Sequence, residues 1–300
     1  MLKNIVNKRS AAAIAAFLAL ASTSLVAQTT TTPTGPDCSQ VPNNADLKKA
    51  LVTVQAQKNS GLGFHMWATV VNRDGFVCAV AFSGAGRGDQ WPGSRVISAQ
   101  KANTANAFSL PNFALSTANL FAATQNGGPL FGLQHSNPVE TTVAYAGPSE
   151  KYGQVDDPMV GKQIGGVNVF GGGLALYTQS ARKIVGGLGV SGDTSCTDHI
   201  IAWKVRDLLN LDNVPGGVAP GVSSGLTVPG VTVPGNDNML NDIFVDRGTG
   251  QKVSTSGYGH PTCDAAAAVI TSGLRGVSHR PRQRAIVEDF SLVGCWRHSV

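Results

Sequence analysis

The chain has 300 residues, with 23 Lys and Arg against 18 Asp and Glu. Three of the basic residues lie within the first 27, so the rest of the chain carries 20 basic and 18 acidic side chains. This near-neutral balance, without a basic stripe interleaved with aromatic residues, argues against a nucleic-acid partner.

The first 27 residues are predicted to be a secretory signal peptide. Lys3, Lys8 and Arg9 precede an apolar run over residues 11–21 that contains no acidic residue, which is the pattern that export machinery reads. The run is shorter than the roughly 20 residues that a membrane-spanning helix needs. We therefore expect a periplasmic or secreted protein with no membrane partner after cleavage; a retained N-terminal anchor is the alternative.

All five cysteines follow the predicted signal peptide, and an oxidising compartment favours disulfides. Cys196 and Cys263 both lie next to predicted helix starts and are the preferred pair, while Cys38 and Cys295 are the other disulfide candidates. Cys78 lies inside an apolar, strand-like run, so we expect it to be the buried free thiol. The pattern by itself does not choose among the possible connectivities.

The first part of the predicted domain reads as a helix followed by a hairpin. Residues 28–45 are rich in Thr, Pro, Gly and Asn and are expected to form a flexible leader. A helix is predicted from Asp46, where apolar residues follow the i, i+3, i+4, i+7 spacing. Strands over residues 64–72 and 76–82 flank an Asp-Gly turn at 74–75, which predicts a hairpin because Gly accepts positive φ.

The middle of the chain is less regular. A second helix is predicted over residues 94–110, and Pro111 would end it. An insertion over about 111–170 mixes turns with short apolar runs, and we expect loops with one or two short strands. Strands at 171–177 and 183–190 then predict a second hairpin.

The last third begins with a helix start signal. Ser195 and Asp198 have the spacing of a capping box, in which both side chains satisfy free amides at a helix N-terminus. This helix would close a domain that begins at residue 46 and ends at 212, before a Pro/Gly-rich linker over residues 213–238. The C-terminal extension, residues 239–300, is expected to pack on the core, with a short strand and then a helix over 265–271.

Two enzyme motifs are considered and discarded. Residues 187–192 match the G-x-G-x-x-G pattern of dinucleotide-binding loops. The surrounding strands are predicted to pair as hairpins instead of βαβ units, which argues against a nicotinamide or flavin site. The segment after Ser191 ends in Asp193 instead of Gly, so it lacks the nucleophile elbow of a serine hydrolase. No dedicated catalytic constellation is identified.

Two candidate binding residues lie on predicted helices. His199 lies one turn into the capped helix with Trp203 and Arg206 on the same face, an arrangement that could hold a planar anionic ligand. The alternative for His199 is a surface histidine beside an amphipathic Trp. Lys101 lies on a mostly apolar helix face, from which it either snorkels to the surface or pairs with an anionic group.

His65 and His260 are the other candidates, each with a plainer interpretation. His65 lies on a strand face and could be a satisfied strand-end residue, and His260, just before Pro261, could serve a turn or a cap. No H-x-x-x-H or E-x-x-H pair occurs, so a structural zinc site is not expected. Cys196, in the first turn of its helix, is the candidate for a reactive thiol if it is unpaired, because free amides and the helix dipole stabilise a thiolate.

Several of these segments occur together and in order in one known family. Lys-Ala-Asn-Thr-Ala at 101–105, Gly-Gly-Leu at 172–174 and Gly-Val-Ser-Gly at 189–192, followed by Asp198, resemble the GlcG/HbpS family of haem-binding proteins, which is also described as DUF336. The resemblance covers residues 46–211. The extra insertion, the C-terminal extension and the cysteines depart from the family pattern.

The resemblance implies a fold and a ligand. The expected fold is α/β (α+β), a profilin-like three-layer sandwich with an antiparallel sheet of about five strands flanked by helices, assembled as a homo-oligomer. The expected cofactor is haem or a related tetrapyrrole, in haem or iron handling or oxidative-stress sensing. An enzyme of the same scaffold acting on a small metabolite or corrinoid is one alternative, and a ligand-free structural or partner-binding module is another. On chemical grounds the cofactor-binding candidates are His199, His65, His260 and Lys101, with His199 as the iron ligand.

Overall fold

A computed structural model describes residues 36–180, 182–219 and 235–274. The predicted signal peptide, most of the predicted linker and Cys295 lie outside these residues. Among the described residues, no helix has the length and apolar character needed to cross a membrane.

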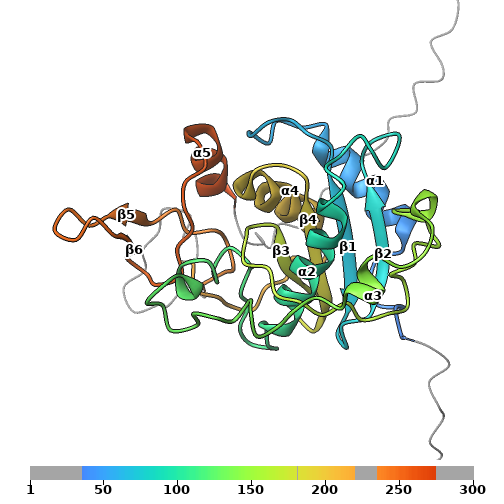
Figure 1. Cartoon of the computed structure of the whole chain (residues 1–300), viewed down its shortest axis with the longest axis horizontal. Coiled ribbons are helices and arrows are strands. Elements are labelled where there is room, and N and C mark those ends of the chain that lie inside the picture. Colours follow the sequence, from blue (N-terminus) through green and yellow to red (C-terminus); the bar gives the residue numbers. More distant parts are fainter. Residues whose placement is uncertain (1–35, 181, 220–234, 275–300) are drawn as a thin grey trace, which may run out of the picture. The chain divides into compact units, whose positions relative to one another are not determined.

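The central element is a four-stranded antiparallel sheet with the order β2-β1-β4-β3. The strands are β1 (Trp67–Asn72), β2 (Val77–Phe82), β3 (Gly173–Tyr177) and β4 (Ile184–Ser191). Both expected hairpins are present, and β4 joins them by pairing with β1 (Figure 1). The described sheet therefore has one strand fewer than the expected five.

Helices cover both faces of this sheet, which gives the expected three layers. The helix α2 (Ser94–Ala107) packs on one face, mainly against β4 and β1. The helices α1 (Asn44–Gln55) and α4 (Ser195–Leu208) pack on the other face, where α1 contacts β2 and α4 contacts β4 and β3 (Figure 1). The α2 helix ends at Ala107, before the expected boundary, and Pro111 lies in the loop that follows.

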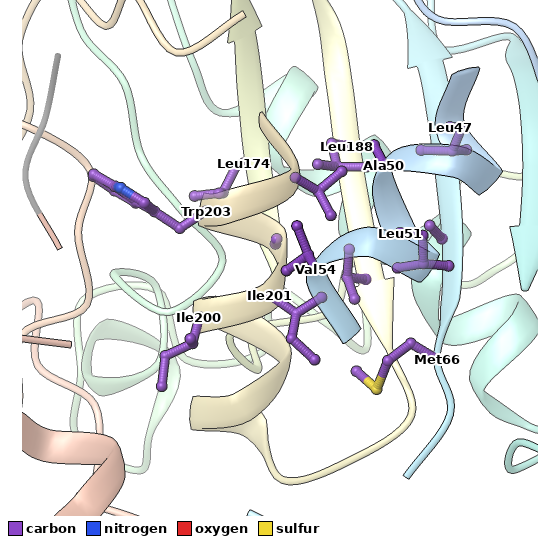
Figure 2. Close-up of a cluster of buried hydrophobic side chains, with 14 of the residues drawn as sticks. Leu47, Ala50, Leu51, Val54, Met66, Leu174, Leu188, Ile200, Ile201 and Trp203 are labelled. Atoms are coloured by element: carbon purple, nitrogen blue, oxygen red, sulfur yellow. The ribbon is translucent and has the colours of Figure 1, made fainter. Parts of the chain in front are cut away.

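Strand alternation explains how both faces are buried. Ala68 and Val70 of β1 belong to the core cluster beneath α1 and α4, whereas Trp67 and Val71 belong to the cluster beneath α2. Successive side chains of a strand point to opposite faces, so a strand covered on both faces reads as a continuous apolar run. Figure 2 shows the first of these clusters, where the predicted apolar stripe of α1 meets α4 and the sheet.

Glycines in β4 let α2 approach the sheet closely. A Cβ added at Gly189 would lie 1.9 Å from the carbonyl oxygen of Ser98, and one at Gly187 would lie 2.2 Å from that of Ala102. No side chain fits between these backbones. The glycines at 187 and 189, which suggested a dinucleotide loop, therefore serve helix–sheet packing.

The insertion over 111–170 is built differently from its prediction. It contains the short helix α3 (Thr141–Ala144) and 3-10 turns at Ala122–Thr124 and Ser149–Lys151, with isolated bridges but no strand among its residues. Gly and Pro turns are frequent there, which favours local turns over sheet ladders.

The described part of the C-terminal extension packs against α4. A hairpin of β5 (Ile243–Val245) and β6 (Lys252–Ser254) precedes the helix α5 (Ala265–Gly273), and α5 contacts α4. Three side chains of the extension join the cluster around α4; these are Met239 before β5, Ala267 of α5 and Leu274 at the end of α5.

Two disulfides fix the ends of the described chain to the core. The preferred pair, Cys196–Cys263, is present and joins α4 to the extension. The prediction that Cys78 is a buried free thiol is wrong, because Cys78 pairs with Cys38. The apolar run suggested burial, and the other residues of β2 are indeed all buried. Cys78 is the one partly exposed position of this edge strand, where the segment before α1 crosses it.

Candidate functional site at the N-terminus of α4

A buried ion pair occupies the point where the end of β4, the start of β3, α2 and α4 meet. The Lys101 Nζ atom lies 2.6 Å from Asp198 Oδ2 and donates to the carbonyl of Val190 at 3.1 Å. A Cβ added at Gly172 would lie 3.2 Å from that ammonium nitrogen, so glycine leaves the space that the pair occupies. The snorkelling alternative for Lys101 is therefore wrong: its side chain is 1% exposed.

Burial opposes charge on both partners of this pair. Desolvation lowers the pKa of Lys101 and raises the pKa of Asp198 to about 6, and the opposite charge of the partner offsets part of each change. Asp198 Oδ1 also accepts the amide N–H groups of Gly192 and Asp193 at 3.1 and 2.9 Å. The carboxylate thus ties the turn after β4 to α2. The expected capping box of Ser195 and Asp198 is wrong, because Thr194 is the N-cap and its side chain accepts the Thr197 N–H.

His199 lies next to Asp198 and is fully buried. Its Nε2 lies 3.2 Å from Asn238 Oδ1, which also accepts the Met239 N–H at 2.8 Å. The Asn238 amide nitrogen donates to the carbonyls of Thr271 and Leu274, so the side-chain oxygen must face the imidazole. The Met239 N–H also lies 3.1 Å from His199 Nε2, so this nitrogen contacts both an acceptor and a donor, while Nδ1 has no hydrogen-bond partner among the described residues.

His199 also has the ring neighbours that its helix spacing predicts. Its ring centroid is 5.9 Å from that of Trp203, and the Arg206 guanidinium lies 4.8 Å from the Trp203 ring. Burial lowers the pKa of His199 to about 4, so the imidazole is neutral at physiological pH. The surface alternative for His199 is wrong.

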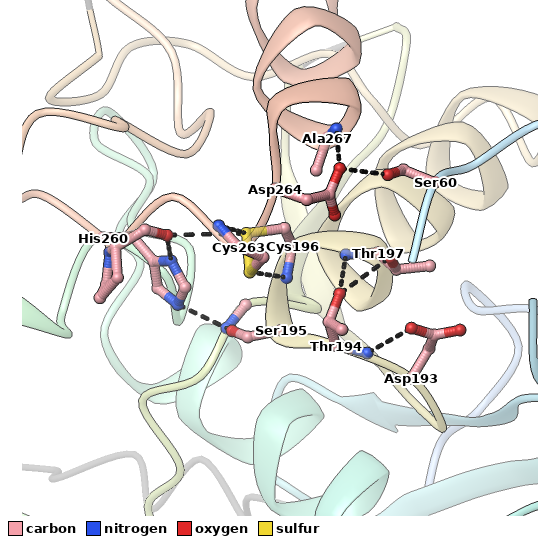
Figure 3. The surroundings of a disulfide bond; sticks show 12 residues. Ser60, Asp193, Thr194, Ser195, Cys196, Thr197, His260, Cys263, Asp264 and Ala267 are labelled. Atoms are coloured by element: carbon pink, nitrogen blue, oxygen red, sulfur yellow. Dashed lines mark hydrogen bonds between the residues drawn. A yellow bond between two sulfur atoms is a disulfide. The ribbon is translucent and has the colours of Figure 1, made fainter. Parts of the chain in front are cut away.

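His260 lies in the extension and contacts the first turn of α4 (Figure 3). Its Nδ1 is 2.8 Å from the Pro261 carbonyl, which can only accept, so Nδ1 carries the proton and Nε2 accepts from Ser195 Oγ at 2.7 Å. The ring centroid is 5.0 Å from that of Phe121. Burial lowers the pKa of His260 to about 4.

Three of the four predicted binding residues are thus brought to one end of α4, and the fourth is not. Lys101 pairs with Asp198, which directly precedes His199 in α4, and His260 contacts the helix one turn earlier. His65 is half-buried and lies two residues before β1, where its Nδ1 is 3.0 Å from Ser83 Oγ. This geometry agrees with the alternative in which His65 is a satisfied strand-end residue.

A cavity of about 660 Å³ adjoins His260. Phe121, whose ring contacts the His260 ring, and Pro261, the next residue along the chain, both line it. The walls come from the insertion and from the extension hairpin, and they include Ile243, Val253 and one cation, Lys252. Its volume falls within the roughly 300–1,000 Å³ that is typical of small-molecule sites.

Sequence reasoning missed two buried ion pairs. Arg206 of α4 binds Asp237 with two hydrogen bonds, of 2.6 and 2.8 Å, and supports this region, whereas Arg95 of α2 binds Asp157 of the insertion in the same way elsewhere in the domain. The partners are 31 and 62 residues apart, so no local spacing reveals them. Residues 236–238, placed in the predicted linker, are buried against α4.

The comparisons with known proteins agree with the resemblance. A family model described as haem degrading protein HbpS-like matches residues 43–206, more than half of the chain. The chain therefore belongs to the HbpS-like family. No curated protein matches it.

Three solved structures can be compared with this chain. The PduOC–haem complex is 22% identical, covers 56% of this chain and 91% of its own, and has a TM-score of 0.39. The ORFY protein of Klebsiella pneumoniae is 21% identical over 58% of this chain and 96% of its own, with a TM-score of 0.37. An HbpS double mutant of Streptomyces reticuli is 17% identical over 59% and 96%, with a TM-score of 0.33.

Proposed function

We propose that this chain is an exported haem-binding protein whose porphyrin occupies the cavity between the insertion and the extension. The observation that carries the proposal is a ligand-sized cavity with apolar and polar walls beside a buried, neutral histidine in a member of the HbpS-like family. Apolar walls suit the porphyrin faces, and a cation at the wall suits a propionate.

The chain's residues fit such a group in three ways. Phe121 and Val253 supply apolar contact, and Lys252 supplies the cation. His260 is our proposed iron ligand, in preference to His199, because its ring packs on Phe121 of the cavity wall, whereas residues 238 and 239 cover His199. To bind iron, His260 Nε2 would exchange its Ser195 hydroxyl contact for the metal. A bound haem would supply the iron chemistry. Lys101 is already satisfied by Asp198, so we assign it a structural role.

Export of the chain is the other part of the proposal. Support comes from the basic and apolar N-terminal pattern together with two disulfides, which persist in oxidising compartments. Homo-oligomerisation is expected from the resemblance, and light scattering of the purified protein would test it. Mass spectrometry of the N-terminus of the exported protein would test the cleavage, with Ala27 as one expected site.

Titration with haemin tests the binding. We expect the wild-type protein to give a saturable Soret shift with one site per chain. His260→Gln should weaken binding about tenfold or more and alter the Soret position, because the iron loses its protein ligand. Lys252→Gln should weaken binding only about threefold, as expected for an exposed ion pair.

His65→Gln is the matched control, because it removes a histidine far from the cavity without a change of net charge. A folded wild-type protein without a saturable Soret shift would remove the haem proposal. If the wild type binds haem and His260→Gln binds it equally well, the iron ligand lies elsewhere, and His199→Gln becomes the next variant.

A further inference from the structure

Three potential metal ligands lie together where the extension is joined to α4. The Sγ atoms of Cys196 and Cys263 and a ring nitrogen of His260 all lie within 4.8 Å of one another (Figure 3). In the structure the two sulfurs form a disulfide, and a disulfide does not coordinate a cation as a thiolate does. The same three side chains can therefore hold either a covalent bond or a metal ion.

We propose that reduction of the Cys196–Cys263 disulfide creates a Cys2His site for a thiophilic cation such as Zn²⁺. This inference concerns the reduced protein without haem and does not rest on the proposed haem site. Two thiolates and one imidazole are the ligand set that Zn²⁺ prefers, with Zn–S near 2.3 Å and Zn–N near 2.0–2.1 Å. Sulfurs bound to one tetrahedral zinc are about 3.8 Å apart, so the sulfurs must separate modestly.

The two sulfurs differ in a way that favours reduction. Cys263 is exposed, whereas Cys196 is 1% exposed and lies in the first turn of α4. A dithiol reductant would attack Cys263 Sγ, and Cys196 would leave as a thiolate. The Cys263 N–H lies 3.3 Å from Cys196 Sγ and the Cys196 N–H lies 3.2 Å from Cys263 Sγ, so each sulfur has one amide that stabilises a thiolate, and exposure decides which sulfur is attacked.

The remaining steps balance without another reactant. The second thiol of the reductant resolves the mixed disulfide at Cys263 and leaves as a cyclic disulfide, so the protein gains two thiols. Binding of Zn²⁺ then releases the two thiol protons. His260 already carries one ring nitrogen with a lone pair, and the fourth tetrahedral position is left for water.

Local geometry holds the three ligands close together without the disulfide. Asp264 Oδ1 accepts the Ala267 N–H at 2.8 Å and the Ser60 hydroxyl at 2.7 Å, and so joins the start of α5 to the segment after α1. The Arg206–Asp237 pair fixes the other end of the extension to α4. The loop that carries Cys263 and His260 is therefore attached on both sides.

Spectroscopic titration with Co²⁺ followed by Zn²⁺ tests the site. Purified protein is reduced with a phosphine, desalted under nitrogen and titrated with Co²⁺. We expect one Co²⁺ per chain, with thiolate charge-transfer bands and the intense d–d bands of tetrahedral cobalt, and displacement by Zn²⁺. The oxidised protein should show neither band.

Variants separate this site from the other disulfide and from unspecific binding. His260→Gln should weaken Zn²⁺ binding about tenfold or more, and Cys263→Ser should remove most of the charge-transfer intensity. His65→Gln is the matched control for the histidine. The C38S/C78S double variant should bind as the wild type does, because it keeps the Cys196 and Cys263 thiols, and adding Cys295→Ser to it should leave the binding unchanged.

Circular dichroism of the reduced protein and of the C196S/C263S variant establishes that both stay folded. If reduced wild-type protein binds no more Co²⁺ than the oxidised form, or if His260→Gln binds Zn²⁺ as tightly as the wild type, the proposal is overturned. Loss of fold in both the reduced protein and the C196S/C263S variant overturns it too, because the three ligands would no longer be held together. Haem binding is measured with the disulfide intact, so failure of either proposal is recognised separately.

Discussion

The Lys101–Asp198 pair shows how a charged residue becomes part of a core. Taking two charges out of water costs several kcal/mol per ion, and only close pairing with further hydrogen bonds offsets that cost. Here the carboxylate accepts two backbone amides and the ammonium donates to a carbonyl besides the ion pair. Each charge is therefore stable in the core only while its partner is present.

Removal of one partner of this pair should be far more harmful than removal of both. We expect Lys101→Met to lower the free energy of unfolding by about 3–5 kcal/mol, because Asp198 is left as a buried, uncompensated charge. The double variant K101M/D198N should lose less than the sum of the two single variants. Urea denaturation of the four proteins measures this coupling, and additive losses would contradict it.

The two buried histidines predict an acid-sensitive contribution to stability. A histidine with a folded pKa of about 4 and an unfolded pKa of about 6.5 binds its proton more readily in the unfolded state, so its contribution to stability falls as the pH drops from 6.5 to 4. Asp198 and Asp212, whose pKa values burial raises to about 6, act in the opposite direction.

Because these contributions oppose each other, the comparison of two proteins isolates one histidine. Between pH 7 and pH 5, His260→Gln should lose about 2 kcal/mol less unfolding free energy than the wild type, since glutamine does not titrate. Chemical denaturation at both pH values measures the difference. Equal losses in the two proteins would mean that His260 titrates normally.

At the scale of elements, the contact between α2 and the sheet is set by glycines. Their positions in β4 were visible in the sequence and suggested a dinucleotide loop, but the same spacing places Gly187 and Gly189 on one strand face under α2. A strand with glycine at alternate positions and a phosphate-binding loop can have the same sequence pattern. The paired strands on both sides of β4 decide between them.

Gly189→Ala should therefore separate α2 from the sheet. Its Cβ would meet the backbone oxygen of Ser98 at 1.9 Å, and backbone cannot give way as a flexible side chain does. We expect a loss of about 3 kcal/mol or more in unfolding free energy, at the upper end of overpacking costs. Gly93→Ala, where an added Cβ meets nothing within 4 Å, is the control. Similar stability of the two variants would refute the close-approach argument.

At the scale of the whole molecule, the extension is tied to the HbpS-like domain by few but strong links. One is the Cys196–Cys263 disulfide, which closes 67 residues, and another is the buried Arg206–Asp237 pair. The cavity proposed for haem has walls from the insertion and from the extension, and the extension lies outside residues 43–206, which the family model matches. The extra segments thus contribute directly to the candidate site.

Loss of the Cys196–Cys263 disulfide should loosen the extension more than the domain. Chain entropy gives about 4 kcal/mol for a closed loop of this length. Limited proteolysis of C196S/C263S should therefore cut within residues 239–274 well before it cuts the sheet. The C38S/C78S variant, which leaves the extension attached, should resist cleavage there, and equal cleavage of the two variants would contradict this assignment.

The sequence by itself determined the features that depend on neighbours in the chain. Apolar periodicity, the Asp-Gly turn and the polar segment before α4 are local, so they predicted α1, both hairpins and the start of α4, although the cap itself is Thr194. The motif segments predicted the family. Only the tertiary structure decided the pairing of Cys78, the burial of His199, the Arg206–Asp237 pair and the cavity beside His260. Each of these joins residues distant in the chain, and their proximity is set by packing, which no local spacing encodes.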